Sequence, residues 1–237
     1  MFRQRSYELE HLDKGDYTPK EYEGCLVELR RINEWLGDAR ALKKSLVPEI
    51  RRAKLQEFSL LDVGAGSGEL LRVVAKEARR RGWRARLTGL ELNERSARAI
   101  LEESRGFAEI SAVRADAFHL PFADGAFDYV ICSLFTHHFR DAGVVEILGE
   151  FKRVARRRLF VIDLHRHALP YVLYTTIGKL FLRNRLIRED GALSIRRSFR
   201  ADELRRLAER AQLQNIAVRR RFPFRLVLSS GGREKMH

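Results

Sequence analysis

The sequence predicts an α/β fold built on a doubly wound, mostly parallel sheet of seven strands, of which the last runs antiparallel. Between residues 58 and 164, short apolar runs alternate with charged amphipathic stretches, a pattern typical of parallel strands joined by helices on both faces of a sheet. Two further apolar runs, at residues 216–222 and 224–229, meet at Pro223. Because a parallel pair needs a long crossover, these two runs can only be antiparallel neighbours.

Periodicity places each element along the chain. The expected strands are residues 58–63, 85–90, 109–114, 127–133, 159–164, 216–222 and 224–229. Apolar residues spaced three and four apart predict helices at residues 19–36, about 39–55, 69–81, 94–104, 141–154 and 201–212. We expect Pro48 to interrupt or restart the second helix.

Two regions are expected beside the sheet itself. Residues 1–55 predict a helical N-terminal cap, and residues 56–237 the main domain with a helical insertion at about residues 165–199. The insertion follows the fifth strand, so it adjoins the carboxyl ends of the strands, where open α/β sheets bind ligands.

Composition limits the kind of protein. The 237 residues are 45% hydrophobic, which is enough for a sizeable core and excludes a disordered chain. Two cysteines, Cys25 and Cys132, are too few for a disulfide framework and favour a reducing compartment. The N-terminus has no apolar signal core, and the longest apolar stretch, residues 168–182, is broken by Gly178 and Lys179. We therefore expect a cytoplasmic protein.

Positive charge is concentrated in the C-terminal third. Residues 151–237 hold 22 basic and 7 acidic side chains, while the formal net charge of the whole chain is +14, so the first 150 residues are nearly neutral. Three interpretations stay open. The charge can form a solvated arginine-rich surface. It can face an anionic membrane, with residues 168–182 as an interfacial helix at the inner leaflet. RNA is less favoured, because no recognisable binding module accompanies the charge.

A glycine-rich turn follows the first strand and opens a helix. The segment reads Leu60-Leu-Asp-Val-Gly64-Ala-Gly66-Ser-Gly68-Glu69, so the backbone can pass close to a ligand without side chains in between. The third glycine of the dinucleotide fingerprint would fall on Glu69, whose carboxylate is unfavourable beside a pyrophosphate. The turn favours a ligand without phosphates, although a tight turn alone would also explain the glycines.

Carboxylates follow the next two strands. Glu91 lies 23 residues beyond Gly68, where a carboxylate can accept hydrogen bonds from both hydroxyls of a bound ribose. The alternative role of Glu91 is to cap the following helix. Asp116 ends the third strand, at a position where an adenine amino group can donate to it. Together with the glycine turn, these carboxylates indicate a nucleoside site.

At this point the sequence resembles the class I S-adenosylmethionine-dependent methyltransferases over about residues 55–164, which have a Rossmann-like fold. The resemblance implies that Asp62 and the loop Gly64–Gly68 surround the methionine moiety, that Glu91 binds ribose, and that Asp116 with Ala117 contacts adenine. It therefore implies S-adenosylmethionine as the cofactor. The full set of implied cofactor-binding residues is Asp62, Gly64, Ala65, Gly66, Gly68, Glu91, Leu92, Asp116, Ala117 and Ser133.

A narrower resemblance covers the flanks. Residues 28–37, 133–139 and 161–167, together with 222–227, are similar to bacterial methyltransferases associated with type III polyketide synthases and quinone-type pathways. That subfamily implies O-methylation of a phenolic lipid or related aromatic product, in secondary metabolism. A phenol with a pKa of about 10 needs a base. His137 and His138 follow the fourth strand and His165 and His167 the fifth, and His138 or His165 is the favoured base.

Several other expectations follow from the same residues. Consecutive residues rarely point the same way, so we expect at most one histidine of each pair to face the pocket. Asp163 has no obvious acidic partner for a hard cation, which favours metal-independent transfer. The acceptor is expected between the N-terminal helix and the insertion, against Tyr22, Arg30, Asn33, Tyr171 and Tyr174. Packing of these residues onto the sheet is the alternative. An RNA methyltransferase and a non-catalytic nucleoside-binding regulator remain as other functions.

Overall fold

The computed structural model describes residues 2–18, 20–22, 24–25, 28, 37–178, 182 and 184–232. Their strands form one sheet in the order β3-β2-β1-β4-β5-β7-β6. The strands are β1 (Glu57–Val63), β2 (Arg84–Glu91), β3 (Ile110–Arg114), β4 (Phe127–Ser133), β5 (Ala155–Leu164), β6 (Gln214–Arg221) and β7 (Arg225–Gly231). Neighbours among β1 to β5 pair in parallel, and β7 is antiparallel to both β5 and β6. The predicted fold class, including the antiparallel last strand, is confirmed.

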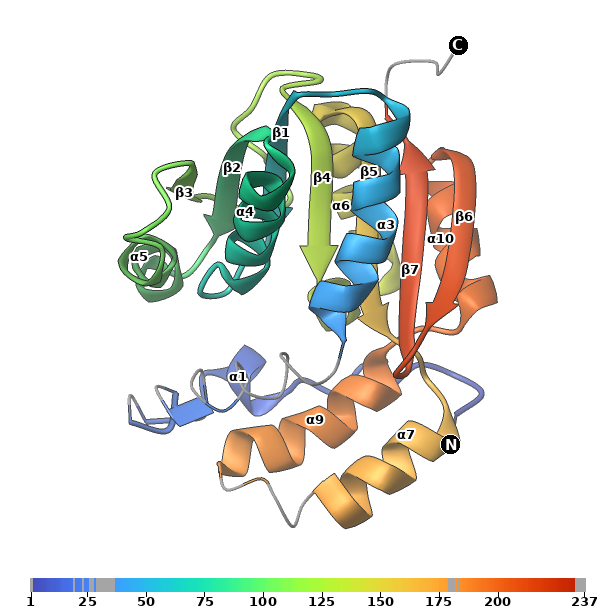
Figure 1. The fold of residues 1–237 in the computed structure, drawn as a ribbon. Coiled ribbons are helices and arrows are strands. Elements are labelled where there is room, and N and C mark those ends of the chain that lie inside the picture. Colours follow the sequence, from blue (N-terminus) through green and yellow to red (C-terminus); the bar gives the residue numbers. More distant parts are fainter. Residues whose placement is uncertain are drawn as a thin grey trace.

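Helices cover both faces of this sheet (Figure 1). One face packs against α3 (Asp38–Arg52), α4 (Glu69–Arg81) and α5 (Glu94–Glu103). The other face packs against α6 (Asp141–Val154) and α10 (Ala201–Arg210). The strands alternate between these two layers as a pleated strand requires: Leu60 and Phe160 face the first, whereas Leu61 and Val161 face the second. All four are at most 2% exposed, and burying each contributes about 1.5–3 kcal/mol.

The predicted interruption at Pro48 is wrong, because α3 continues through this residue. Leu42, Leu46 and Ile50 form one apolar stripe on both sides of Pro48, and all three are buried against the sheet layer. A proline inside a helix costs about 3 kcal/mol. Burial of three large side chains on one continuous stripe exceeds that cost.

A third layer lies below the carboxyl ends of the parallel strands (Figure 1). It contains α1 (His11–Lys14) from the N-terminal segment, and α7 (Ala168–Leu173), η2 (Tyr174–Gly178) and α9 (Arg185–Arg197) from the insertion after β5. Of the predicted cap, α1 belongs to this layer while α3 lies along the sheet. The predicted helix at residues 19–36 falls mostly outside the described residues. No helix in the described part of the chain is long and apolar enough to span a bilayer.

Candidate active site

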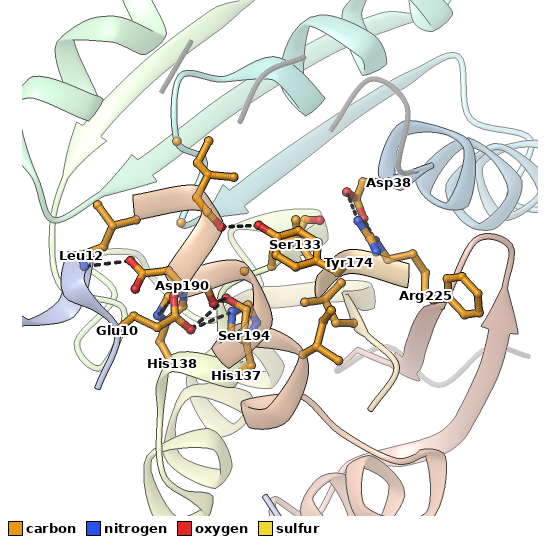
Figure 2. A pocket seen from close by; sticks show the side chains of 18 of the residues that line it. Glu10, Leu12, Asp38, Ser133, His137, His138, Tyr174, Asp190, Ser194 and Arg225 are labelled. Atoms are coloured by element: carbon orange, nitrogen blue, oxygen red, sulfur yellow. Dashed lines mark hydrogen bonds and ion pairs between the residues drawn. The ribbon is translucent and has the colours of Figure 1, made fainter. Parts of the chain in front are cut away.

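A cavity of about 660 Å³ separates the sheet from the layer below it (Figure 2). The ends of β1, β4 and β5 form its upper wall, and α1, η2 and α9 form its lower wall. The polar residues that line it from the two walls include Glu10, Asp38, Asp62, Ser133, His137, His138, His165, Asp190, Ser194 and Arg225. The cavity thus lies where an open α/β sheet binds ligands.

The glycine loop forms one side of the cavity, and its positions require glycine for different reasons. Gly64, Gly66 and Gly68 all have positive φ angles, of 71°, 57° and 79°. A Cβ on Gly64 would lie 2.6 Å from the Phe135 ring, so packing requires that glycine. A Cβ on Gly66 would meet nothing within 4 Å. Gly66 is therefore the position where the loop leaves open space for a ligand.

Glu91 is fixed against this loop. Its Oε1 accepts a hydrogen bond from the Gly66 backbone N–H at 2.6 Å. Burial raises the pKa of Glu91 to about 7, although hydrogen bonds from the backbones of Gly66 and Leu92 oppose the rise. The alternative of a helix cap does not apply, because Asn93 caps α5 by accepting from the backbone N–H groups of Arg95 and Ser96. Glu91 itself is not among the residues that line the cavity, so its predicted role rests on its bond to Gly66, which does line it.

Two buried polar atoms beside the loop have no hydrogen-bond partner among the described residues. They are Oδ1 of Asp62 and Oγ of Ser133, at the ends of the adjacent strands β1 and β4. Burial, and then the nearby Glu91, raise the pKa of Asp62 well above its usual range. A buried polar group without a partner costs about 1–3 kcal/mol. The two atoms therefore fit a polar ligand that supplies the missing hydrogen bonds.

A buried histidine–carboxylate pair lies further along the same cavity. Nδ1 of His137 and Oδ1 of Asp163 are 2.7 Å apart, and the two residues are 3% and 0% exposed. Thr136 Oγ1 and the backbone N–H groups of His137 and Leu164 also donate to the Asp163 carboxylate. Burial alone would raise the pKa of Asp163, but the His137 imidazole and these hydrogen bonds lower it. An ionised Asp163 accepts the Nδ1–H and leaves Nε2 of His137 free to accept a proton.

Both His137 and His138 line the cavity, which corrects the expectation that only one of a pair would do so. Their rings lie 4.4 Å apart. The alternation rule applies to strands, whereas these residues belong to the 3-10 turn η1 (Thr136–His138). The second pair behaves as predicted, since His165 lines this cavity and His167 does not.

A carboxylate from the N-terminal segment completes this end of the site. Glu10 is 2% exposed, and its Oε1 lies 3.9 Å from Nε2 of His137 and accepts from Ser194 Oγ at 2.9 Å. Burial raises the pKa of Glu10 to about 7, although the nearby His138 and Arg197 oppose the rise. Ligand atoms of Glu10, His137 and His138 all lie within 4.8 Å of one another, a spacing that can hold a metal ion. Metal-independent transfer therefore stays a prediction.

Several predicted site residues lie elsewhere. Tyr22 stacks on Tyr17 and shares a hydrogen bond with Ser96 on α5, and Tyr171 packs edge-on against Phe2. Neither residue is among those that line the main cavity. The predicted acceptor role of these two side chains is thus not supported, because other groups of the fold already hold them. Arg30 and Asn33 lie outside the described residues.

The remaining predicted residues differ in their surroundings. Leu92 and Asp116 are exposed and Ala117 is buried, and none of the three lines the main cavity. Asp116 follows β3 and accepts from the Phe118 backbone N–H at 2.9 Å. Tyr174 does line the cavity, and its hydroxyl donates to the Ile187 carbonyl.

No motif or spacing in the sequence indicated Glu10, Asp190 or Ser194 as site residues. Asp190 is 4% exposed and accepts from the backbone N–H groups of His11 and Leu12, which joins α9 to the N-terminal segment. Figure 2 shows this group gathered with His137 and His138 on one side of the cavity, apart from the buried ion pair of Asp38 and Arg225. Only proximity in the fold unites these residues, since no spacing in the sequence does.

Comparisons with known proteins agree with this geometry. Residues 61–162 match the family model of a methyltransferase domain. A demethylmenaquinone methyltransferase from Staphylococcus aureus (strain MRSA252) is 29% identical over 171 residues, which are 67% of this chain and 69% of that relative.

Solved structures share the fold. A SAM-dependent methyltransferase from Aquifex aeolicus is 18% identical, with a TM-score of 0.57 over 85% of this chain and 96% of that one. The magnesium protoporphyrin IX methyltransferase from Synechocystis PCC 6803 with bound SAH is 17% identical, with a TM-score of 0.57 over 83% and 84%. A protein from Pyrococcus horikoshii OT3 is 17% identical, with a TM-score of 0.60 over 87% and 99%.

Residues 61–162 are thus similar to a methyltransferase domain, and the sheet has the Rossmann-like α/β fold that these solved methyltransferases share. Among these solved structures, one is a SAM-dependent methyltransferase and another holds SAH. The matched segment runs from β1 to β5, and the insertion after β5 lies over the carboxyl ends of those strands.

Proposed function

We propose that this enzyme transfers the methyl group of S-adenosylmethionine to a hydroxyl group of a small aromatic acceptor of the phenolic-lipid or quinone type. The observation that carries the proposal is the buried His137–Asp163 pair, whose histidine lines the same cavity as the glycine loop. The similarity to a demethylmenaquinone methyltransferase supports a quinone-type acceptor. The apolar lining contributed by Leu12, Leu134 and Ile187 suits an aromatic ring.

The cofactor fits the residues beside the loop. The open space next to Gly66 suits the part of the cofactor that would lie against the backbone of the glycine loop. The unpartnered atoms of Asp62 and Ser133 suit the polar amino-acid end of the cofactor. Glu91 suits the ribose hydroxyls, because a carboxylate only accepts hydrogen bonds. When bound, S-adenosylmethionine supplies an electrophilic methyl group on a sulfonium. The protein supplies alignment, exclusion of water and a base.

His137 is the proposed base, in preference to His138 and His165. Its Nε2 takes the acceptor hydroxyl proton, while Asp163 holds the tautomer and stabilises the imidazolium that forms. His138 also bonds a carboxylate through Nδ1, that of Asp13 at 2.9 Å, but the side chains of this pair are 24% and 22% exposed, whereas those of His137 and Asp163 are 3% and 0% exposed and exclude water. The pKa of His165 is lowered, first by burial and then by Arg220, and no carboxylate among the described residues orients its ring.

Transfer of a labelled methyl group to a panel of alkylated phenols and quinols tests the proposal. His137→Asn should lower kcat at least about 100-fold, as is usual when a positioned general base is lost. Its affinity for S-adenosylhomocysteine should stay unchanged, and the matched change His165→Asn should have a small effect on kcat. Labelling of tRNA or rRNA in place of the phenols would instead support the RNA methyltransferase. If no acceptor is labelled although S-adenosylhomocysteine binds, the result would favour the non-catalytic nucleoside-binding regulator.

A further inference from the structure

A second cavity, of about 720 Å³, adjoins the active site and is unusually basic. His165, Phe224 and Arg225 line both cavities. The second cavity is further lined by Arg166, His167, Leu169, Arg200, Ala201, Asp202, Arg220, Arg221 and Phe222. It therefore begins where the active-site cavity ends, at the carboxyl end of β5 and the start of β7.

Two of its arginines are neutralised by the protein. Arg225 forms a bidentate pair with buried Asp38, and Arg166 bonds Glu203 and the Ser198 carbonyl. These two guanidinium groups are structural, because their donors are directed at carboxylates or carbonyls of the fold. The positive electrostatic potential of the cavity therefore comes from its other arginines.

Arg200, Arg220 and Arg221 have no carboxylate partner among the described residues. Among the described residues, Asp202 is the only acidic side chain that lines this cavity, and it pairs with Arg206 on α10. Nε of Arg221 is buried and has no hydrogen-bond partner in the described part of the chain. A buried guanidinium N–H without an acceptor is costly, and it indicates that a ligand atom can accept from it.

The positive charges act on one another across the cavity. Burial lowers the pKa of His165, and the charges of Arg220, His167 and Arg200 lower it further. Like charges that are brought together without a counter-ion repel, so a bound anion would remove a repulsion that the free protein carries. Guanidinium groups that have no carboxylate partner suit phosphate, since each offers a planar fork of hydrogen-bond donors.

We infer that this second cavity binds a phosphate-bearing group, held by Arg200, Arg220 and Arg221. The group belongs either to the methyl acceptor itself, which would extend from the active site past His165, or to a phospholipid headgroup at the mouth of the cavity. Phe222 is 80% exposed and Leu169 is 50% exposed, so apolar surface lies beside the arginines for the rest of such a ligand. The role beside the acceptor rests on the proposed function, whereas phosphate binding does not.

The test uses the full chain and inorganic phosphate as its probe. The His165 ring protons are followed by NMR while phosphate is titrated at constant ionic strength. Phosphate should give a saturable shift and raise the pKa of His165, and Arg200→Gln/Arg220→Gln should abolish both effects. Arg51→Gln/Arg210→Gln removes the same charge from exposed helical positions outside the cavity and should leave both effects intact.

Sedimentation with vesicles identifies the source of the phosphate. If vesicles of phosphatidylglycerol and phosphatidylcholine bind the wild type and the control variant but not Arg200→Gln/Arg220→Gln, the site takes a lipid headgroup. If vesicle binding is absent or equal in both variants while phosphate binding still needs the arginines, the site takes a soluble phosphate-bearing ligand. An unsaturable or absent response to phosphate, or one that survives in Arg200→Gln/Arg220→Gln, would overturn the inference. Calorimetry with S-adenosylhomocysteine on the same variants reports separately on the methyltransferase site.

Discussion

Glu91 should make the cofactor affinity of this enzyme depend on pH in the neutral range. Burial raises its pKa to about 7 in the free protein, so near pH 6 most of the molecules carry a protonated Glu91. Ribose hydroxyls that donate to the carboxylate favour its charged form and lower its pKa in the complex. Binding therefore releases a proton, and the affinity should rise with pH until it levels off above about pH 7.

The size of this effect follows from the pKa. If only the ionised form binds, the apparent Kd is multiplied by one plus the ratio of protonated to ionised Glu91, which is about 11 at pH 6 and about 1.1 at pH 8. The expected loss on going from pH 8 to pH 6 is thus about tenfold in Kd, or about 1.4 kcal/mol. Glu91→Gln cannot titrate, so its affinity should be about 1–3 kcal/mol weaker at pH 8 and nearly flat with pH.

Isothermal titration calorimetry with S-adenosylhomocysteine at pH 6 and pH 8 measures both quantities. Runs in two buffers of different ionisation enthalpy also count the released proton. Glu94→Gln is the matched control, because Glu94 is an exposed carboxylate three residues away and makes its ion pairs with Arg98 and Arg114. A flat profile in the wild type would refute the assignment of Glu91. An unchanged slope in Glu91→Gln would refute it as well, and would assign the titration to another group.

Three other changes test the rest of the site. The pKa of Glu10 is about 7 in the folded protein and 4.5 in its ordinary state, so ionisation of Glu10 should lower the free energy of unfolding by about 3 kcal/mol. This loss of stability should be absent below about pH 4.5 and complete above about pH 7. Urea denaturation at pH 5 and pH 8 should show the loss in the wild type and a smaller loss in Glu10→Gln. Treatment with a chelator, checked by elemental analysis, should leave methyl transfer unchanged if no metal lies between Glu10, His137 and His138, whereas recovery of lost activity by one divalent ion would assign that site to a metal. Gly66→Ala should lower the free energy of unfolding by about 1 kcal/mol or more, because Gly66 has a positive φ angle. It should also weaken the binding of S-adenosylhomocysteine, which calorimetry on the folded variant would measure. Unchanged affinity would contradict the assignment of the space beside Gly66 to the ligand.

The fold could be predicted because its determinants are local. Strand periodicity marked β1 to β5, and the short connection at Pro223 required the antiparallel hairpin of β6 and β7 that the structure contains. Pro48 was misjudged because its cost was weighed without the buried stripe that keeps α3 continuous. The free-energy cost of an unfavourable residue in a helix is overridden where burial of the helix against the core contributes a larger free energy.

The two ends of the cavity differed in how well the sequence described them. Gly66 and Glu91 stand at the ends of neighbouring strands and are linked by a hydrogen bond, as their spacing suggested. No spacing in the sequence distinguishes His137 from His138 and His165, because its partner, Asp163, lies 26 residues away in β5. Tyr22 and Tyr171 were placed by elimination, and the contacts that hold them come from residues whose positions only the fold determines.

The two ends of the cavity are held by different kinds of contact. The residues around the glycine loop come from one continuous stretch of the sheet, whereas the other end of the cavity is closed by contacts between the N-terminal segment and α9. Glu10 accepts from Ser194 across 184 residues, and Asp190 accepts from the His11 backbone across 179. Neither contact involves a residue of the sheet, so a substitution in the lower wall need not disturb the strand ends. Under the proposed function, residues of the lower wall can therefore determine the acceptor while the loop and Glu91 bind the cofactor.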